Sequence, residues 1–193
     1  MQTIANQKKI IRAKLLEKRK AIGKTACLSK SQAITKRLLA LPEFIAAKTI
    51  HFYLSDDTEV QTDGLIEESL RLGKQVVVPL LDEMALSQID DLHPDHFEMH
   101  PFGIRSLKEP FCKVVSSACV DLWILPGVGY DRMGHRLGRG AGYYDRLLSG
   151  ISAKITGLAF ECQIVEMIPI LEHDKQIDQI ITEERTIICR RER

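Results

Sequence analysis

Two apolar runs place the strongest limits on the folds that this chain can adopt. The segment QVVVPLL covers residues 75–81, and VDLWILPG covers residues 120–127. Neither run keeps up the alternation of polar and apolar residues that a strand with one wet face would show. Continuous apolar runs are typical of strands that are buried on both faces of a parallel sheet. The chain is therefore expected to build such a sheet and to cover it with helices.

The rest of the chain supplies the other strands and the helices. Further strands are expected at residues 49–55, 153–160, 175–183 and 185–191, with the last two at sheet edges. Helices are expected at residues 5–22, from Ser29 or Ser31 to just before Pro42, from Thr62 to Gly73, and at 143–150. Residues 82–113 are expected to form an irregular surface excursion. The prediction is one domain over residues 1–193, an α/β three-layer sandwich whose mostly parallel central sheet carries helices on both faces.

Composition narrows the class of protein. Of the 193 residues, 45% are hydrophobic and 27% are charged, which is ordinary for a globular chain. The formal net charge of +1 excludes a globally basic surface, so no nucleic-acid partner is expected. No apolar run reaches the length of a membrane span, so no membrane partner is expected either. The five cysteines are scattered without a CxxC pair, which indicates free thiols and a cytoplasmic location.

The stretch GHRLGRGAGYYDR, residues 134–146, concentrates glycine, arginine and tyrosine after the second apolar run. A loop between a buried strand and a helix lies where parallel sheets bind their ligands. The backbone N–H groups of such a loop attract an anion, and Arg136 and Arg139 offer forked donors that suit phosphate. Asp145 would repel that phosphate unless a divalent cation lay between them. The residues alone therefore predict a phosphate or nucleotide site with Mg²⁺.

Other interpretations of this stretch stay open at this point. It lacks the Gly-Lys-Ser/Thr ending of a Walker A loop, and Tyr143 stands where the dinucleotide-binding fingerprint needs its third glycine. The plainer interpretation is a flexible surface hairpin whose glycines only turn the chain. Tyr143 and Tyr144 diverge on a helix, so one is expected to pack inward while the other faces a ligand.

The longer segment LPGVGYDRMGHRLGRGAGYYDR, residues 125–146, resembles the signature loop of 5-formyltetrahydrofolate cyclo-ligases, also called methenyltetrahydrofolate synthetases. KKIIR at residues 8–12, YLSDDTEVQT at 53–62 and KQIDQIITE at 175–183 resemble further pieces of that family, in the same order. The resemblance implies a three-layer α/β fold. It also implies that Mg-ATP drives conversion of 5-formyltetrahydrofolate to 5,10-methenyltetrahydrofolate, with release of ADP and phosphate. A monomer that binds these two small molecules is expected.

The resemblance also assigns roles to residues that match the family's motifs. The implied ATP contacts are Lys8, Lys9, Arg12, Arg136, Leu137, Gly138, Arg139, Gly140, Ala141, Gly142, Tyr143 and Tyr144. The implied folate contacts are Leu54, Glu59, Arg139, Gly140, Ala141, Gly142 and Tyr143. Asp145 and Asp178 are the implied Mg²⁺ ligands. Arg139, Lys8 and Arg12 are expected to act on the reacting groups.

Plainer interpretations stand beside these assignments. Leu54 also suits the hydrophobic core, and Asp178 by itself would be an exposed strand residue. The remaining basic residues of the first helix are interpreted as a solvated face, namely Lys14, Lys18, Arg19 and Lys20. Ala141 stands where many relatives carry lysine or glycine, so Arg139 is expected to carry more of the positive charge.

Segment 82–113 contains two weaker patterns. PFGIRSLKEP resembles a family segment near the folate pocket, but extra residues separate its halves and affect the assignment of Phe102, Ile104 and Glu109. The segment HPDHFEMH, residues 93–100, contains three histidines whose spacing would suit a zinc site if the segment were helical. Pro94 and Pro101 disfavour a helix there.

Two other classes of function are weighed against the cyclo-ligase interpretation. One is an ATP-independent enzyme on a related α/β architecture, such as a sugar-phosphate isomerase or a CoA transferase, which a test for ATP binding would separate. The other is an RNA-binding module built on the basic first helix and the paired tyrosines. That module would show strongly salt-dependent affinity for RNA.

Overall fold

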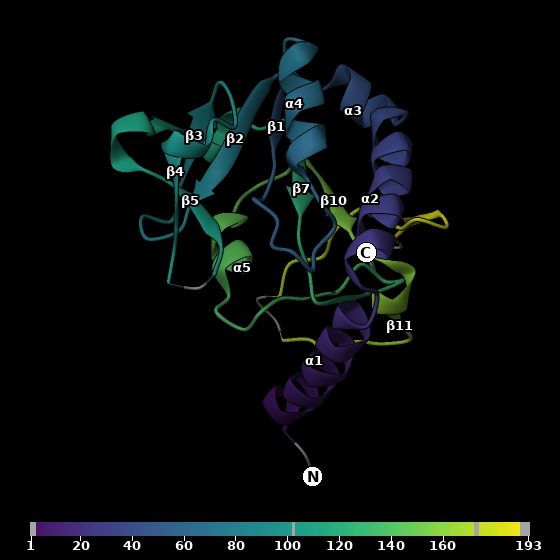
Figure 1. Cartoon of the computed structure of the whole chain (residues 1–193). Coiled ribbons are helices and arrows are strands. Elements are labelled where there is room, and N and C mark those ends of the chain that lie inside the picture. The colour runs from purple at the N-terminus through teal and green to yellow at the C-terminus, as the bar shows by residue number, and fades with distance from the viewer. Residues whose placement is uncertain (1–2, 102, 172–173, 190–193) are drawn as a thin grey trace.

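A large central sheet organises the molecule, and helices pack on both of its faces (Figure 1). The computed structural model describes residues 3–101, 103–171 and 174–189. Along β2 (Gln75–Leu80), successive side chains point to opposite faces. Val76 and Val78 join one core cluster, whereas Val77 joins a second cluster on the other face. This confirms the three-layer α/β arrangement expected from the sequence.

The α-helices divide between the two faces. In the described part of the chain they are α1 (Ile4–Lys20), α2 (Lys24–Leu39), α3 (Pro42–Ala46), α4 (Asp63–Arg71) and α5 (Tyr143–Leu147). Side chains from α2, α3 and α4 fill the first cluster, and those from α5 fill the second. Short 3₁₀ turns connect other elements: η1 (Pro94–His96), η2 (Glu109–Phe111), η3 (Ser117–Cys119) and η4 (Glu161–Gln163). No helix within the described ranges is long and apolar enough to cross a membrane.

The central sheet has eight strands in the order β13-β12-β10-β7-β1-β2-β3-β6. Besides β2, these are β1 (Thr49–His51), β3 (Ala85–Ile89), β6 (Lys113–Val115), β7 (Leu122–Leu125), β10 (Lys154–Leu158), β12 (Gln179–Ile181) and β13 (Thr186–Ile188). All pairs from β12 across to β2 are parallel, whereas β13, β3 and β6 add antiparallel strands at the two edges. The sheet is therefore mostly parallel, as expected.

Two smaller sheets lie outside the central one. Strands β8 (Gly129–Asp131), β9 (Arg136–Leu137) and β11 (Ile164–Val165) form one, and β4 (Phe97–Met99) and β5 (Arg105–Leu107) form the other. The hairpin β8–β9 ends in the first part of the glycine-rich stretch, where β9 replaces part of the loop that the sequence predicted. In Figure 1, α1 lies below the strands, and its Leu15 packs so tightly on Gly129 that a Cβ there would lie 2.3 Å from Leu15 Cδ1.

Three expectations about elements were wrong. Helix α2 begins at Lys24, not at Ser29 or Ser31, because Gly23 with φ 75° turns the chain directly from α1 into α2. The Ser31 hydroxyl instead accepts a hydrogen bond from the backbone N–H of Gln61. Residues 82–113 are not an irregular excursion, because β3 and β6 extend the central sheet. Strand β12 is not at an edge, since it lies between β10 and β13.

The early end of β1 prepares the functional site. Strand pairing stops at His51, although a strand to residue 55 was predicted, and residues 52–55 continue as buried extended chain. Beyond them lies the turn Asp56–Glu59, at the carboxyl end of the parallel strands. Ligands of parallel α/β sheets bind at that end.

Candidate active site

Three segments meet beyond the carboxyl ends of β1 and β7. They are the turn after β1, the glycine-rich stretch after β7, and the inner side of α1. Each segment comes from a different part of the sequence, and hydrogen bonds and ion pairs join them. This is the part of the structure in which most of the sequence-predicted residues come together.

The turn Asp56–Glu59 holds two carboxylates in fixed positions. Asp56 Oδ1 accepts hydrogen bonds from the backbone N–H groups of Thr58 (2.7 Å) and Glu59 (3.0 Å) and from the Thr58 hydroxyl (2.8 Å). Glu59 Oε2 in turn accepts from the backbone N–H of Asp56 at 3.2 Å. These local bonds are those of an Asx turn, which explains why the chain turns here. They leave Asp56 Oδ2 and Glu59 Oε1 to face other partners.

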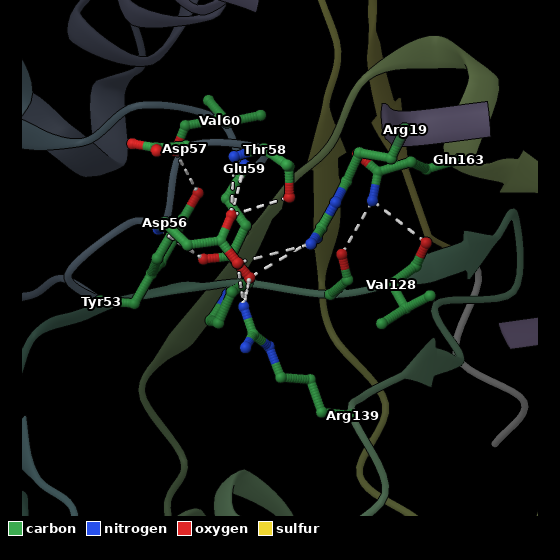
Figure 2. Close-up of polar contacts among 12 residues, drawn as sticks. Arg19, Tyr53, Asp56, Asp57, Thr58, Glu59, Val60, Val128, Arg139 and Gln163 are labelled. Carbon is green, nitrogen blue, oxygen red and sulfur yellow. Dashed lines mark hydrogen bonds and ion pairs between the residues drawn. The ribbon is translucent and has the colours of Figure 1, made fainter. Parts of the chain in front are cut away.

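Two arginines share those remaining oxygens, as Figure 2 shows. Arg139 Nη2 donates to Asp56 Oδ2 and, at 3.0 Å, to Glu59 Oε1. From α1, Arg19 lies 3.6 Å from Asp56 Oδ2 and 3.5 Å from Glu59 Oε1. Burial alone would raise the pKa of Asp56, but the hydrogen bonds from Thr58 and the two positive charges lower it below its usual value. The cluster therefore keeps the Asp56 carboxylate ionised beside the glycine-rich stretch.

Arg19 corrects an expectation from the sequence. It was interpreted as part of a solvated basic face, yet its side chain is only 4% exposed. Helical periodicity places Arg19 one turn beyond Leu15, which is also buried, so both lie on the inner face of α1. The neighbouring Lys14, Lys18 and Lys20 are exposed, in agreement with the solvated-face interpretation.

The glycine-rich stretch is tied to α1. Arg12 Nε donates a 2.9 Å hydrogen bond to the carbonyl of Gly138, and a Cβ at Gly140 would lie 3.6 Å from Arg12 Nη2. Gly140 and Gly142 have φ values of 112° and 64°, which favour glycine. Helix α5 begins directly after Gly142. The predicted proximity of Arg12 to this stretch is thus present in the structure.

Arg136 and the two tyrosines anchor the start of α5. Arg136 Nη2 forms an ion pair with Asp145 at 3.2 Å, and its guanidinium lies 5.4 Å from the centre of the Tyr144 ring. Tyr144 is buried in the core and lies against His51, so it is the tyrosine that packs inward. Tyr143 donates from its hydroxyl to the carbonyl of Leu80, and burial raises its pKa to about 12. Both tyrosines are therefore neutral at physiological pH.

Lys8 and Lys9 lie at the other end of α1. Lys8 forms an ion pair with Asp174, and both side chains are largely buried. Lys9 is exposed. Lys8 and Arg12 are one helical turn apart and share a face, whereas Lys9 faces solvent. Of the three predicted phosphate contacts on this helix, the structure brings two together on one face.

The implied metal ligands, Asp145 and Asp178, are not brought together. Asp178 stands just before β12, where its Oδ2 accepts from the backbone N–H of Ile155 at 2.8 Å and its Oδ1 lies 3.7 Å from Lys154 Nζ. Those partners begin β10, while Arg136, the partner of Asp145, also bonds to Pro126 just beyond the carboxyl end of β7. Within the described residues, no group of three or more His, Cys, Asp or Glu side chains is placed to hold a metal ion.

Several other assigned residues have clear places. Leu54 is 2% exposed within the first core cluster, which favours its interpretation as a core residue. In the segment PFGIRSLKEP, residues 101–110, Ile104 is half-buried before β5 and Glu109 is exposed in η2. Phe102 lies outside the described residues. His96 stacks on Phe111 and contacts Asp91 at 2.8 Å.

Sequence reasoning missed Asp56, Arg19 and Gln163. Gln163 in η4 donates from Nε2 to the carbonyls of Gly127 (2.8 Å) and Val128 (3.1 Å), which holds the chain after β7. It lines a narrow recess together with Arg19, Tyr53 and Glu59, and this recess has no room for a water molecule. The recess therefore has to open to admit a bicyclic ligand. For Asp56, the sequence signal was its position beside Asp57 in YLSDDTEVQT, directly after a predicted strand.

Comparison with known proteins identifies the family. The 5-formyltetrahydrofolate cyclo-ligase family profile matches residues 4–183. The chain belongs to this family. It is similar to the 5-formyltetrahydrofolate cyclo-ligase of Escherichia coli, at 31% identity over 86% of this chain and 94% of that one. It is also similar to the enzyme of that name from Mus musculus, at 29% identity over 94% and 96% of the two chains.

A solved structure supports the same assignment. The NMR structure of Aquifex aeolicus 5,10-methenyltetrahydrofolate synthetase matches this chain with a TM-score of 0.83 at 30% identity, covering 96% of this chain and 94% of that one. Membership of the cyclo-ligase family confirms the resemblance of the signature loop and identifies the chain as an enzyme. Of the two alternative classes, the isomerase-like enzyme and the RNA-binding module, this assignment favours neither. The monomeric state, the single domain and the cytoplasmic location stay predictions.

Proposed function

We propose that the chain converts 5-formyltetrahydrofolate to 5,10-methenyltetrahydrofolate with ATP and Mg²⁺, releasing ADP and phosphate. The observation that carries the proposal is that Arg12 of α1 bonds to Gly138 of the glycine-rich stretch, next to Arg139, which bonds to Glu59 in the turn after β1. Positive donors for a polyphosphate and carboxylates for a polar heterocycle are thus adjacent. That is the arrangement that transfer of a phosphoryl group between ATP and a folate requires.

The chemistry explains why both ligands must be adjacent. An N-formyl amide is a weak electrophile, and its oxygen leaves only after it has been phosphorylated. The formyl oxygen attacks the γ-phosphorus and ADP leaves. The nitrogen at position 10 then attacks the formyl carbon and loses its proton, and the C–O bond breaks to release phosphate. Neither step needs a protein nucleophile. The protein has to align the oxygen with the phosphorus and neutralise the developing charge.

The predicted contacts divide between the two substrates. We assign Lys8, Arg12, Arg136 and Arg139 to the ATP phosphates, and the N–H groups between residues 137 and 144 to the same anion. Glu59 accepts hydrogen bonds from the polar edge of the folate, and Arg139 contacts both ligands. Arg139 contacts Glu59 in this structure, which supports its assignment to the boundary between the sites. Lys9 contributes long-range positive charge from the exposed side of α1.

Asp145 fits a magnesium site better than Asp178 does. Mg²⁺ is commonly bound by one or two carboxylates together with substrate phosphates. Asp145 stands in the first turn of α5, directly after the glycines, and its side chain is 21% exposed. The Asp178 carboxylate is engaged by Ile155 and Lys154, so its metal role rests on the resemblance alone. When bound, Mg²⁺ would offset the negative charge of the ATP phosphates.

The direct test is an absorbance assay. Purified protein is mixed with 5-formyltetrahydrofolate, ATP and Mg²⁺, and the rise in methenyltetrahydrofolate absorbance is followed together with ADP release. We expect one ADP for each product molecule and no product when ATP is omitted. A folded, metal-supplied protein that leaves the folate unchanged would disprove the proposal. Product formation without ATP would disprove the phosphorylation step.

A further inference from the structure

We propose that Arg19 is a positioning residue for the folate site, which holds the Glu59 and Asp56 carboxylates in place while Arg139 exchanges them for the ATP phosphate. The inference rests on the proposed function, because it assigns Glu59 to the folate and Arg139 to both ligands. It extends that function to a buried residue that none of the motifs includes.

The two arginines contact the same atoms but differ in how firmly they are held. Arg19 and Arg139 both approach Glu59 Oε1 and Asp56 Oδ2, Arg19 from the upper right and Arg139 from below in Figure 2. The Arg19 side chain is 4% exposed and comes from the body of a 17-residue helix. The Arg139 side chain is 42% exposed and comes from a stretch between glycines. Arg139 can therefore move away from the two carboxylates, whereas Arg19 stays in contact with them.

Charge balance makes the fixed partner necessary. Without a ligand, two arginines face two carboxylates. If Arg139 turns to a phosphate, its positive charge leaves a largely buried pair of acids. Without Arg19, those acids would repel each other and move apart. Arg19 prevents this, so Glu59 stays oriented as an acceptor for N–H donors of a bicyclic heterocycle.

The recess supports a role toward ligand and not only toward the scaffold. Arg19 and Glu59 line it together with Tyr53 and Gln163. The Nε of Arg19 is buried and has no hydrogen-bond partner among the described residues. Buried polar donors are nearly always paired in proteins, so an unpaired one beside a recess that opens is expected to meet a ligand atom.

The test compares Arg19→Met and Arg19→Lys with Lys20→Met, which removes an exposed positive charge from the next position of α1. KM is measured for each substrate in turn, and 5-formyltetrahydrofolate binding is measured separately by calorimetry. We expect Arg19→Met to weaken folate binding and raise its KM by about tenfold or more, with the KM for ATP changed by less than about twofold. Arg19→Lys keeps the charge but loses the fork, so its folate KM should lie between those of the wild type and Arg19→Met. Lys20→Met should match the wild type.

Other outcomes would overturn the inference. If Arg19→Met does not fold, Arg19→Lys carries the test, and an unchanged folate KM for that variant would contradict the inference. Equal changes in both KM values, together with a lower melting temperature, would make Arg19 a purely structural residue. A wild-type protein that neither binds nor converts 5-formyltetrahydrofolate would disprove the proposed function and this inference with it. Full wild-type activity with unaffected Arg19 variants would overturn the inference alone.

Discussion

Arg139 and Glu59 are 80 residues apart in the sequence, and Arg139 Nη2 donates a 3.0 Å hydrogen bond to Glu59 Oε1. The bond joins the glycine-rich stretch to the turn after β1. Burial would lower the pKa of Arg139, but the charges of Glu59 and Asp56 outweigh that effect and raise it. Arg139 therefore keeps its positive charge and bridges the two segments that we assign to different substrates.

Replacement of this residue should separate catalysis from folding. We expect Arg139→Ala to lower turnover by about a hundredfold or more, because the variant lacks the positive charge that stabilises the phosphoryl group during its transfer. The melting temperature should change little, because the side chain is partly exposed and Arg19 still contacts both acids. Turnover is read from methenyltetrahydrofolate absorbance and stability from thermal unfolding. Loss of folding in this variant would show that Arg139 is structural.

Lys8 offers a test of phosphate binding with a matched partner variant. If Lys8 binds ATP, Lys8→Ala should raise the KM for ATP by about tenfold, and adding Lys9→Ala should raise it further. Asp174→Asn removes the ion-pair partner but leaves the lysine, so it should not weaken ATP binding. The KM for ATP and the melting temperature are measured for all of these variants. If Lys8→Ala and Asp174→Asn lower stability alike and leave the KM for ATP unchanged, Lys8 serves only the ion pair.

Asp145→Asn tests the metal site, because it keeps the size of the side chain and removes its charge. The dipole of a helix N-terminus favours a carboxylate by about 0.3–1 kcal/mol, and Asp145 also pairs with the buried Arg136. If the role of Asp145 is only structural, the variant should therefore lose at least that much stability and keep normal turnover. If Asp145 holds Mg²⁺, turnover should collapse and recover partly as the Mg²⁺ concentration rises.

Asp178→Asn is the companion variant. It weakens the bond to the Ile155 N–H and the contact with Lys154, so we expect lower stability and an unchanged Mg²⁺ dependence. Turnover is measured against Mg²⁺ concentration for the wild type and both variants. Overlap of the wild-type and Asp145→Asn curves would remove Asp145 from the site. If the Asp178→Asn curve shifts to higher Mg²⁺ concentration, Asp178 belongs to the metal site after all.

The burial of His51 predicts that the folded state loses stability at acidic pH. Burial lowers its pKa from 6.5 to about 3, against a weak opposing effect of its hydrogen bond to the Ile124 carbonyl. As the pH falls, the unfolded chain therefore takes up this proton first. The stability that His51 contributes is complete above about pH 6.5 and is lost toward pH 3, at about 1.4 kcal/mol per pH unit.

His51→Gln should remove that dependence, because glutamine does not titrate. Free energies of unfolding are measured in urea between pH 7 and pH 4. Below about pH 6.5, the dependence of that free energy on pH should be smaller than in the wild type by the contribution of one proton, about 1.4 kcal/mol per pH unit. His93→Gln is the control, since its side chain is 59% exposed. An unchanged slope in His51→Gln would mean that another group causes the acid sensitivity.

The sequence alone determined the buried strands β2 and β7 and the position of the glycine-rich stretch between β7 and α5. Val76–Val78 and Leu122–Leu125 are apolar without interruption, and only a strand covered on both faces tolerates that pattern. Gly73 marks the end of α4 because its φ of 74° is one that other residues rarely adopt. These signals are local, so they can be read from neighbouring residues. The short strands β3 and β6 escaped prediction because ALSQI and KVV contain no long apolar run, although β3 pairs with the preceding strand β2 as a hairpin.

Only the tertiary structure decided which charged residues belong to the site. Arg19 looks like its solvated neighbours in sequence, but the packing of α1 turns it toward Glu59. Asp145 and Asp178 match a shared role, yet their carboxylates have separate partners. A local pattern shows that a residue carries a charge, but the free energy of that charge depends on burial and on partners distant in the chain. Those partners are known only once the strands and α1 have been placed in space.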